Sequence, residues 1–189
     1  MKKLTILFTL LFTSITAFGQ AHQINPQDSE VKVTGTSTIH DWDVNAQEFG
    51  GSGNFEIGNG ELISVSNLKL SVKVNSIKSG KGAMDKKIYE ALKEKNHKEI
   101  IFAGKGVEEI SGDKIFVNGD LTIAGVTKSI TLEADYEILP DNSLIFTGSY
   151  PISMKEFGMN PPTAMFGSIK TGNDVRVHFN TTFSTSSNS

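Results

Sequence analysis

The chain of 189 residues contains no cysteine, one tryptophan and one arginine. Without cysteine, no disulfide framework can support the fold and the chain cannot be processed into a lipoprotein. A domain of about 170 residues can nevertheless bury a sufficient core of its own. We therefore expect one domain, residues 20–189, held together by packing alone.

Positive charge is also scarce in the part of the chain expected to fold. Without Lys2 and Lys3, 16 basic residues stand against 21 acidic ones, so the rest of the chain has a formal charge of −5. The single arginine is Arg176. An acidic protein of this composition is a poor candidate for binding nucleic acid or anionic membrane surfaces.

A long hydrophobic run is absent except for a short one at the start. Lys2 and Lys3 precede the apolar run Leu4–Phe12, and small residues follow up to Gly19. This pattern predicts a secretory signal peptide, residues 1–19, cut after Gly19. The run is too short for a comfortable membrane span, so we expect an exported protein that does not span the membrane.

Motifs of known catalytic and metal sites are missing as well. No G-x-S-x-G element, glycine-rich phosphate loop or paired-carboxylate arrangement in the sequence rises above chance. Its four histidines have no metal-ligand spacing, and Asp41 and Asp43 beside His40 are expected to face solvent. We therefore expect a binding protein with no metal, no cofactor and no enzymatic activity.

What the sequence does have is strict alternation of apolar and polar residues, clearest in Gly119–Tyr136. Period two is typical of half-buried strands. Gly125-Val126 fits a two-residue turn with glycine at its first central position. The predicted register places Ile130 opposite Leu121 and Leu132 opposite Gly119, and the missing side chain of Gly119 would leave room inside.

The same alternation recurs along most of the chain. Further strands are predicted at residues 31–35, 40–46, 54–57, 62–77, 100–106, 114–123, 129–138, 144–153 and 174–183. Glycines 50, 51 and 53 predict a bend or bulge. Ala83–Lys95 instead repeats apolar residues every fourth position, as an amphipathic helix does, and Met154–Asn173 is irregular. These elements predict an all-β protein: an antiparallel barrel of about eight strands, or a two-sheet sandwich, with one helix.

The polar faces of the strands exclude an outer-membrane barrel, whose outward face must be apolar. Charged or polar residues sit at mid-strand on one face of several strands, among them Lys69, Lys73, Glu133, Asp135 and Arg176. We therefore expect the outward faces of these strands to contact water rather than lipid.

Two features have more than one interpretation. Met84, Ile88 and Leu92 on the helix can pack against the end of the barrel as ordinary core, or the helix can also form the lid or wall of an apolar pocket. Methionine suits adaptable apolar surfaces, and four of the five methionines lie in the helix and the irregular segment. Trp42 has the same ambiguity between core packing and ligand contact.

The sequence resembles the YceI-like family of exported bacterial proteins. The motifs that carry the resemblance are T-S-T-I-H-D-W (36–42), G-x-M-D (82–85), I-I-F (100–102), G-D-L-T-I-A-G-V-T-K (119–128), E-F-G-M-N-P-P (156–162) and I-K-T-G-N-D-V (169–175). The resemblance covers nearly the whole chain after residue 19. One departure is His97-Lys98-Glu99, where the family often has a proline before the I-x-F strand.

The resemblance implies a lipocalin-like barrel whose interior holds a long-chain isoprenoid lipid, a periplasmic location and a homodimer. The expected wall residues are Trp42, Val44, Leu70, Val72, Met84, Ile88, Phe102, Leu121, Leu132, Phe146, Phe157, Met159 and Phe179. The expected head-group residues are His40, Asp85, Lys86 and Lys170. The alternative is a structural or stress-related barrel without a bound lipid, filled by its own side chains.

Overall fold

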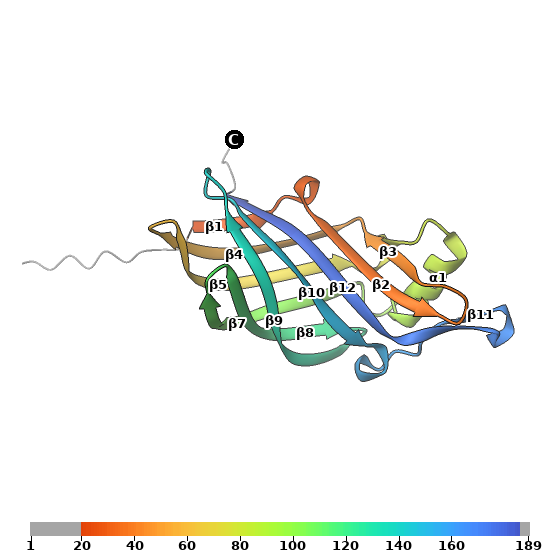
Figure 1. The fold of residues 1–189 in the computed structure, drawn as a ribbon. Coiled ribbons are helices and arrows are strands. Elements are labelled where there is room, and N and C mark those ends of the chain that lie inside the picture. The colour runs from red at the N-terminus through yellow and green to blue at the C-terminus, as the bar shows by residue number, and fades with distance from the viewer. Residues whose placement is uncertain (1–19, 186–189) are drawn as a thin grey trace, which may run out of the picture.

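A computed structural model describes residues 20–185, and most of its strands join into one antiparallel sheet (Figure 1). The predicted signal peptide lies outside the described residues. The elements are β1 (Gln20–Ile24), η1 (Pro26–Asp28), β2 (Glu30–Ser37), β3 (Trp42–Ala46), β4 (Phe49–Gly58), β5 (Glu61–Lys73), η2 (Val74–Ser76), β6 (Ile77–Lys78), α1 (Gly82–Ala91), β7 (Glu99–Ser111), β8 (Lys114–Ile123), β9 (Val126–Ile138), β10 (Leu144–Ser153), η3 (Met154–Phe157), β11 (Thr163–Ala164), η4 (Met165–Gly167) and β12 (Ile169–Thr185).

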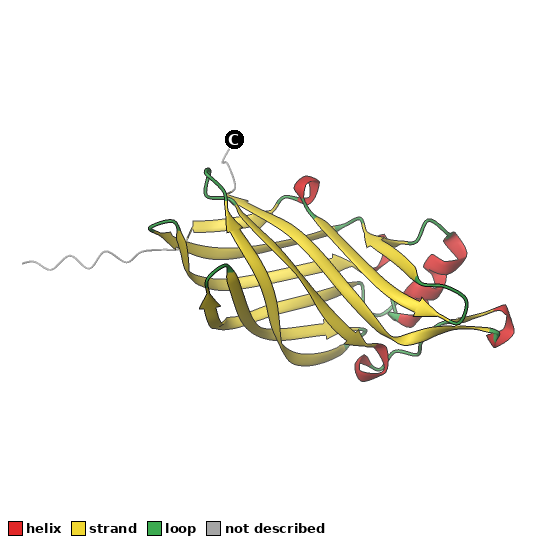
Figure 2. Cartoon of the chain, in the orientation of Figure 1, coloured by secondary structure: helices red, strands yellow, loops and turns green. Residues whose placement is uncertain are grey.

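Eight of these strands close into a barrel. The order runs β1, β4, β5, β7, β8, β9, β10 and β12, and β12 pairs back with β1. Strands dominate the cartoon and α1 is the one α-helix of the described chain (Figure 2). The predicted fold class, an antiparallel barrel of about eight strands with one helix, is confirmed.

The last strand, β12, organises the wall. One of its edges pairs with β10. Its other edge carries β2 along residues 171–180 and β1 along residues 183–185, so these two strands follow each other on the same edge. Beyond β2 the sheet continues with β3 and β6. The barrel wall is therefore widened near α1.

The register predicted for the β8–β9 hairpin is wrong by two residues. Ala124 and Gly125 form the turn, so that Ile123 pairs with Val126 and Gly119 with Ile130. Both turn residues have positive φ, 49° and 83°, as a type I′ turn requires, and this turn matches the twist of the strands. Because the slip is an even number of residues, the predicted inward face is unchanged.

Two further elements, β1 and α1, differ from the prediction, and the glycine run agrees with it. β1 lies where no strand was predicted, and His22 within it is 1% exposed and faces the core. The glycine run lies inside β4, where the register shifts between Ser52 and Asn54, as the expected bulge requires. Helix α1 ends at Ala91 rather than at residue 95, because Lys93 adopts a left-handed φ of 55°.

The barrel is elongated and has two different ends (Figure 1). We call the end that carries α1, β11 and the loops at residues 37–41 and 161–168 the helix end. The opposite end, formed by the turns at residues 59–60, 112–113 and 140–142, is the turn end. β5, β7 and β9 each have 13 residues, about 44 Å of strand. At a tilt of roughly 40° the wall is about 34 Å high.

Candidate ligand-binding site

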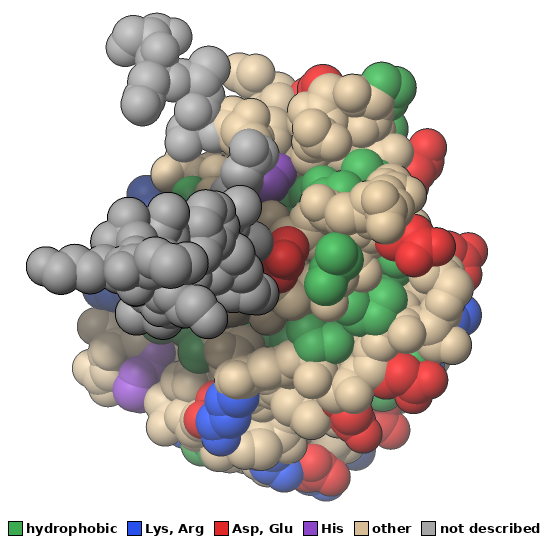
Figure 3. All heavy atoms as spheres, turned by 90° about the vertical axis from the view of Figure 1, so that its left-hand side faces the viewer, with side chains coloured by type: hydrophobic (Ala, Val, Ile, Leu, Met, Phe, Trp, Pro, Cys, Tyr) green, Lys and Arg blue, Asp and Glu red, His purple; other side chains and the backbone are tan. Residues whose placement is uncertain are grey.

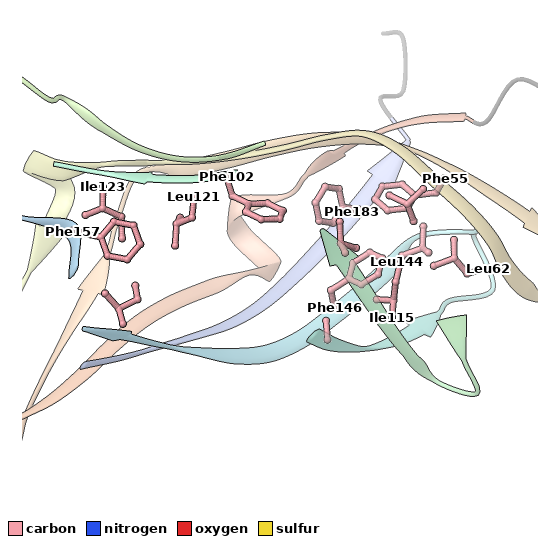
Figure 4. Packing of buried hydrophobic residues seen from close by; sticks show 14 of the residues in the cluster. Phe55, Leu62, Phe102, Ile115, Leu121, Ile123, Leu144, Phe146, Phe157 and Phe183 are labelled. Carbon is pink, nitrogen blue, oxygen red and sulfur yellow. The ribbon is translucent and has the colours of Figure 1, made fainter. Parts of the chain in front are cut away.

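The turn end of the barrel is closed by packed aromatic rings. Phe55 lies 5.1 Å from Phe183 and 5.4 Å from Phe146 between ring centroids, and Phe146 lies 5.6 Å from Phe183. His22 meets the edge of Phe55 at 5.3 Å and Leu144 is fully buried beside them. Figure 4 shows the three phenylalanines gathered at one end of the row of core residues. A ligand must therefore enter elsewhere.

Towards the middle of the barrel the packing gives way to a cavity of about 180 Å³, the main cavity. A single water molecule needs only about 10–15 Å³, and apolar cavities of about 150 Å³ stay dry and bind small apolar molecules. None of the described residues that line the main cavity is charged. Seven predicted wall residues line it: Leu70, Val72, Phe102, Leu121, Leu132, Phe146 and Phe179.

A second cavity of about 130 Å³, the helix-end cavity, lies under α1 and the irregular segment. Lys87 is its one charged lining residue among those described. It shares six wall residues with the main cavity, so the two adjoin along the barrel: Val33, Ile77, Ile100, Ile123, Ile152 and Val177. Five predicted wall residues line it: Trp42, Val44, Met84, Ile88 and Met159.

The helix is a cavity wall as well as a packing element. No residue of α1 is fully buried, although Met84 and Ile88 pack against a small core cluster of Val44, Ala46 and Ile77. Both side chains also line the helix-end cavity. The structure thus favours the pocket-wall interpretation of α1, and Trp42 borders the same space.

Phe157 is the one predicted wall residue that lines neither cavity. Its side chain is 3% exposed, and the Lys128 ammonium lies 5.6 Å from its ring centroid. The structure places it at the end of η3, in the core cluster that also contains Met154 and Met159.

Three cavity-lining aromatic rings lie flat over glycines of the barrel wall. An added Cβ on Gly35 would meet Trp42 at 2.3 Å, and one on Gly148 would meet Phe179 at 2.5 Å. Trp42 and Phe179 each sit directly opposite the glycine that they cover. Phe102 covers Gly119 in the same way, at 2.4 Å.

The expectation that Gly119 opens space is therefore wrong, because the ring of Phe102 fills the position. These glycines instead leave the lumen open indirectly. Because they have no side chain, each allows an aromatic ring to lie against the wall, and a ring held there does not cross the lumen. Pairing of this kind is a known way to stabilise glycines in sheets.

The interior offers few directional groups. Every buried side-chain nitrogen or oxygen within residues 20–185 has a hydrogen-bond partner. The buried hydroxyl of Thr181, in the wall of the main cavity, donates to the Phe146 carbonyl oxygen at 3.5 Å. A ligand inside would be held by apolar burial, which needs no alignment, and a polar head group would remain outside.

The four predicted head-group residues all lie at the helix end, but they do not form one cluster. His40 is exposed and its ring Nδ1 lies 2.7 Å from the Asp41 carbonyl oxygen. Lys86 and Lys170 are exposed. Asp85 accepts hydrogen bonds from the hydroxyl and the backbone N–H of Ser79, and these lower the pKa of Asp85.

Many lining residues lay on the predicted faces without being singled out. Ile115, Val117, Ile123, Ile130 and Val177 share the parity of their predicted neighbours, so the alternation alone could have found them. Ile24 could not be found that way, because β1 has too few residues for a pattern.

Residues 20–185 contain neither a candidate metal site nor a candidate membrane-spanning helix. Within residues 20–185 no group of three or more histidine, aspartate or glutamate side chains could hold a metal ion. No helix in that range is long and apolar enough to cross a membrane.

Comparison with known proteins supports the sequence resemblance. Residues 22–183 match the YceI-like domain. The crystal structure of BcnA from Burkholderia cenocepacia has a TM-score of 0.68 and 16% identity, covering 84% of this chain and 98% of that one. A polyisoprenoid-binding domain from Saccharophagus degradans, implicated in plant cell wall breakdown, also has a TM-score of 0.68, with 12% identity and coverage of 88% and 99%.

A third structure, the YCEI protein of Campylobacter jejuni, has a TM-score of 0.59 and 20% identity, and the match covers 74% of this chain and 82% of that one. No curated protein matches the chain by sequence. At these identities the structural likeness shows the fold alone.

Proposed function

The chain belongs to the YceI-like domain family, and from that premise we propose that it is a carrier that holds one isoprenoid-type lipid inside its barrel. The observation that carries the proposal is the pair of adjoining apolar cavities. The lipid is a polyisoprenoid, a quinone or a prenyl phosphate, held for transport, storage or stress protection. The polyisoprenoid-binding domain with the same fold supports this ligand class.

The energetics favour a long apolar chain. Each buried methylene contributes about 0.8 kcal/mol, so one five-carbon isoprene unit gains about 3–4 kcal/mol before costs. The main cavity has no charged lining residue among those described, so no desolvated charge opposes such a ligand. The wall is long enough for several units in a row, and the closed turn end leaves the head group at the helix end.

The proposal includes the place and the mode of action. The signal peptide predicted at residues 1–19 supports export to the periplasm, where an isoprenoid lipid must be shielded from water between membranes. Binding alone is proposed, with no catalytic step, since the interior is apolar and its few polar atoms are already hydrogen-bonded. The family resemblance also supports a homodimer.

Native mass spectrometry of protein purified from its own host tests the proposal. We expect a mass gain equal to one lipid, and the same gain when a delipidated sample is mixed with a polyprenol. Leu132→Trp, on the wall of the main cavity, should weaken binding at least tenfold by filling the lumen. Ile145→Trp is the matched control, because Ile145 pairs with Glu137 and Thr182 and lines neither cavity.

A ligand-free mass that polyprenols do not change would overturn the carrier proposal. That result would favour the alternative, a structural barrel without a bound lipid. Equal binding by the wild type and Leu132→Trp would show that the lipid does not occupy the main cavity.

A further inference from the structure

Three large apolar side chains project into solvent together at the helix end. Ile39 is 61% exposed, Met165 is 70% exposed and Phe166 is fully exposed. The two loops that carry them are joined, since the Thr38 N–H donates to the Lys170 carbonyl oxygen at 3.0 Å and the Lys170 N–H donates to the Thr38 hydroxyl at 3.2 Å. We call Ile39, Met165 and Phe166 the apolar tip.

The backbone holds the tip in a costly conformation. Met165 and Phe166 have φ of 50° and 53° and Gly167 follows with 88°, so two non-glycine residues in succession are left-handed. Such strain persists where the surroundings impose it and is concentrated at functional sites. The exposed side chain of Phe166 gives no packing energy to the barrel that would offset the strain. An aromatic residue in this position is accounted for if its ring is buried against something outside the chain.

The charges near the tip have an excess of one sign. Lys81, Lys86 and Lys170 are exposed at the helix end, and none of them takes part in an ion pair within residues 20–185. Asp41 is the exposed carboxylate in the tip loops, and Asp85 at the start of α1 is bound to Ser79.

The turn end has mainly negative charge. Its turns and the strand ends beside them carry Glu56, Glu61, Glu108, Glu109, Asp113, Asp135, Glu137 and Asp141. Figure 3, which looks onto that side of the molecule, shows an apolar patch bordered mainly by acidic side chains, with basic ones along the lower rim. The formal charge of −5 made binding to anionic surfaces unexpected. This negative charge is concentrated away from the tip.

We propose that the apolar tip docks the helix end of the barrel onto a bilayer that contains anionic lipids. Ile39, Met165 and Phe166 would enter the boundary between head groups and acyl chains, and the unpaired lysines would contact lipid phosphates. Short apolar segments flanked by lysines bind membrane interfaces in this way. Three side chains are too few for a stable protein interface, which needs about 800 Å² from each partner.

Docking at this end also places the helix-end cavity against the membrane. Pro162 and Thr171, which line that cavity, flank the tip segment and are joined by a hydrogen bond from the Thr171 N–H to the Pro162 carbonyl oxygen at 3.0 Å. The inference goes beyond the proposed function, because it concerns the outer surface and holds for any content of the barrel.

Vesicle flotation tests the docking. The protein is taken from Gln20 onwards, so that it keeps every barrel strand and lacks the apolar residues 4–12, which would bind membranes themselves. We expect it to float with vesicles of phosphatidylcholine and phosphatidylglycerol in equal parts, and much less with phosphatidylcholine alone. Binding should fall as salt rises, because screening weakens the lysine–phosphate attraction.

Variants locate the contact. Phe166→Ser should reduce vesicle binding about tenfold, since the burial of one large apolar side chain is lost. Ile63→Ser is the matched control: Ile63 is 55% exposed but lies in β5 near the turn end, and its loss should leave binding unchanged. Lys86→Glu combined with Lys170→Glu should remove the preference for phosphatidylglycerol.

A melting curve keeps the test independent of folding. Because the Phe166 side chain is fully exposed and its φ is positive, Phe166→Gly should lose vesicle binding while its melting temperature stays equal or rises. No binding to the anionic vesicles, or equal loss in the Ile63 and Phe166 variants, would overturn the docking. The vesicles contain no isoprenoid, so failure here leaves the carrier proposal untouched, and a protein without ligand can still dock.

Discussion

Replacing Ala134 by leucine tests whether the main cavity is space that a side chain can occupy. Ala134 is 6% exposed, faces inward from β9 opposite Ile115 and lines the main cavity. Leucine adds three carbon atoms at this position. At about 0.8 kcal/mol for each buried carbon group, full burial adds about 2.4 kcal/mol to the free energy of unfolding. The loss of side-chain rotamer entropy on folding lowers this gain by about 0.5–1 kcal/mol. We expect a net gain of about 1.5 kcal/mol in the free energy of unfolding.

The size of the cavity supports this figure. At about 24 cal/mol for each Å³ of unfilled volume, the 180 Å³ of the main cavity corresponds to about 4 kcal/mol. The leucine would recover less than half of it. For a domain of this size the gain raises the melting temperature by about 3–6 °C.

Thermal and urea denaturation of the delipidated protein measure the effect, with Ala103→Leu as the control. Ala103 has the same side chain but is exposed, between Lys69 and Asp120 on neighbouring strands. Its replacement should change the free energy of unfolding by less than about 0.5 kcal/mol. The Ala134 variant should also bind the apolar dye N-phenyl-1-naphthylamine more weakly. A loss of more than about 1 kcal/mol in that variant alone would refute the reasoning, because it would mean that the wall around Ala134 is already fully packed.

Three further predictions concern the rings, the helix and the tryptophan. Gly148→Val should lower the free energy of unfolding by about 2 kcal/mol in urea denaturation, since its Cβ would displace the Phe179 ring into the lumen. Gly106→Val, where a Cβ meets no atom within 4 Å, should cost clearly less. Asp85→Ala should cost about 1 kcal/mol by removing the two hydrogen bonds accepted from the loop before α1. Those bonds lower the pKa of Asp85. Their contribution to the free energy of unfolding is therefore complete above the unfolded pKa of about 3.9 and is lost as the pH falls through the folded pKa. If the free energy of unfolding of the variant falls equally steeply at low pH, this account is wrong. Emission from Trp42, the one tryptophan, should shift to shorter wavelength when a polyprenol fills the helix-end cavity, and an unchanged spectrum at saturation would show that the lipid stops at the main cavity.

The barrel and most of its lining were predictable because a strand has only two faces. Once the alternation in Gly119–Tyr136 was recognised, the inward set followed, and even the wrong turn at Gly125-Val126 left it intact. Twelve of the thirteen predicted wall residues line a cavity, and Phe157 does not. Whether they contact a lipid stays a prediction.

The remaining features depend on packing that a single sequence does not encode locally. Phe157 and Phe166 are both lone aromatic residues in the irregular segment, yet one is 3% exposed and the other fully exposed. The residues next to them in the sequence do not indicate which of the two is buried. The difference in burial arises because only one of the two loops folds back onto the barrel. In the same way, the contact of the Phe102 ring with Gly119 can be predicted only once the pairing of β7 with β8 is known.

The position of β12 has a consequence for the order in which the barrel folds. Near the C-terminal end of the chain, this strand is bonded to β10, β2, β1 and β11, and the contact His22↔Thr185 joins residues almost the whole described chain apart. The ring cannot close while these last residues are missing. Folds dominated by such distant contacts assemble slowly, so a growing chain stays open until β12 has been synthesised. If the chain is exported as we propose, this delay would keep the polypeptide in the extended state that a secretion channel can thread, and the barrel would close only after translocation.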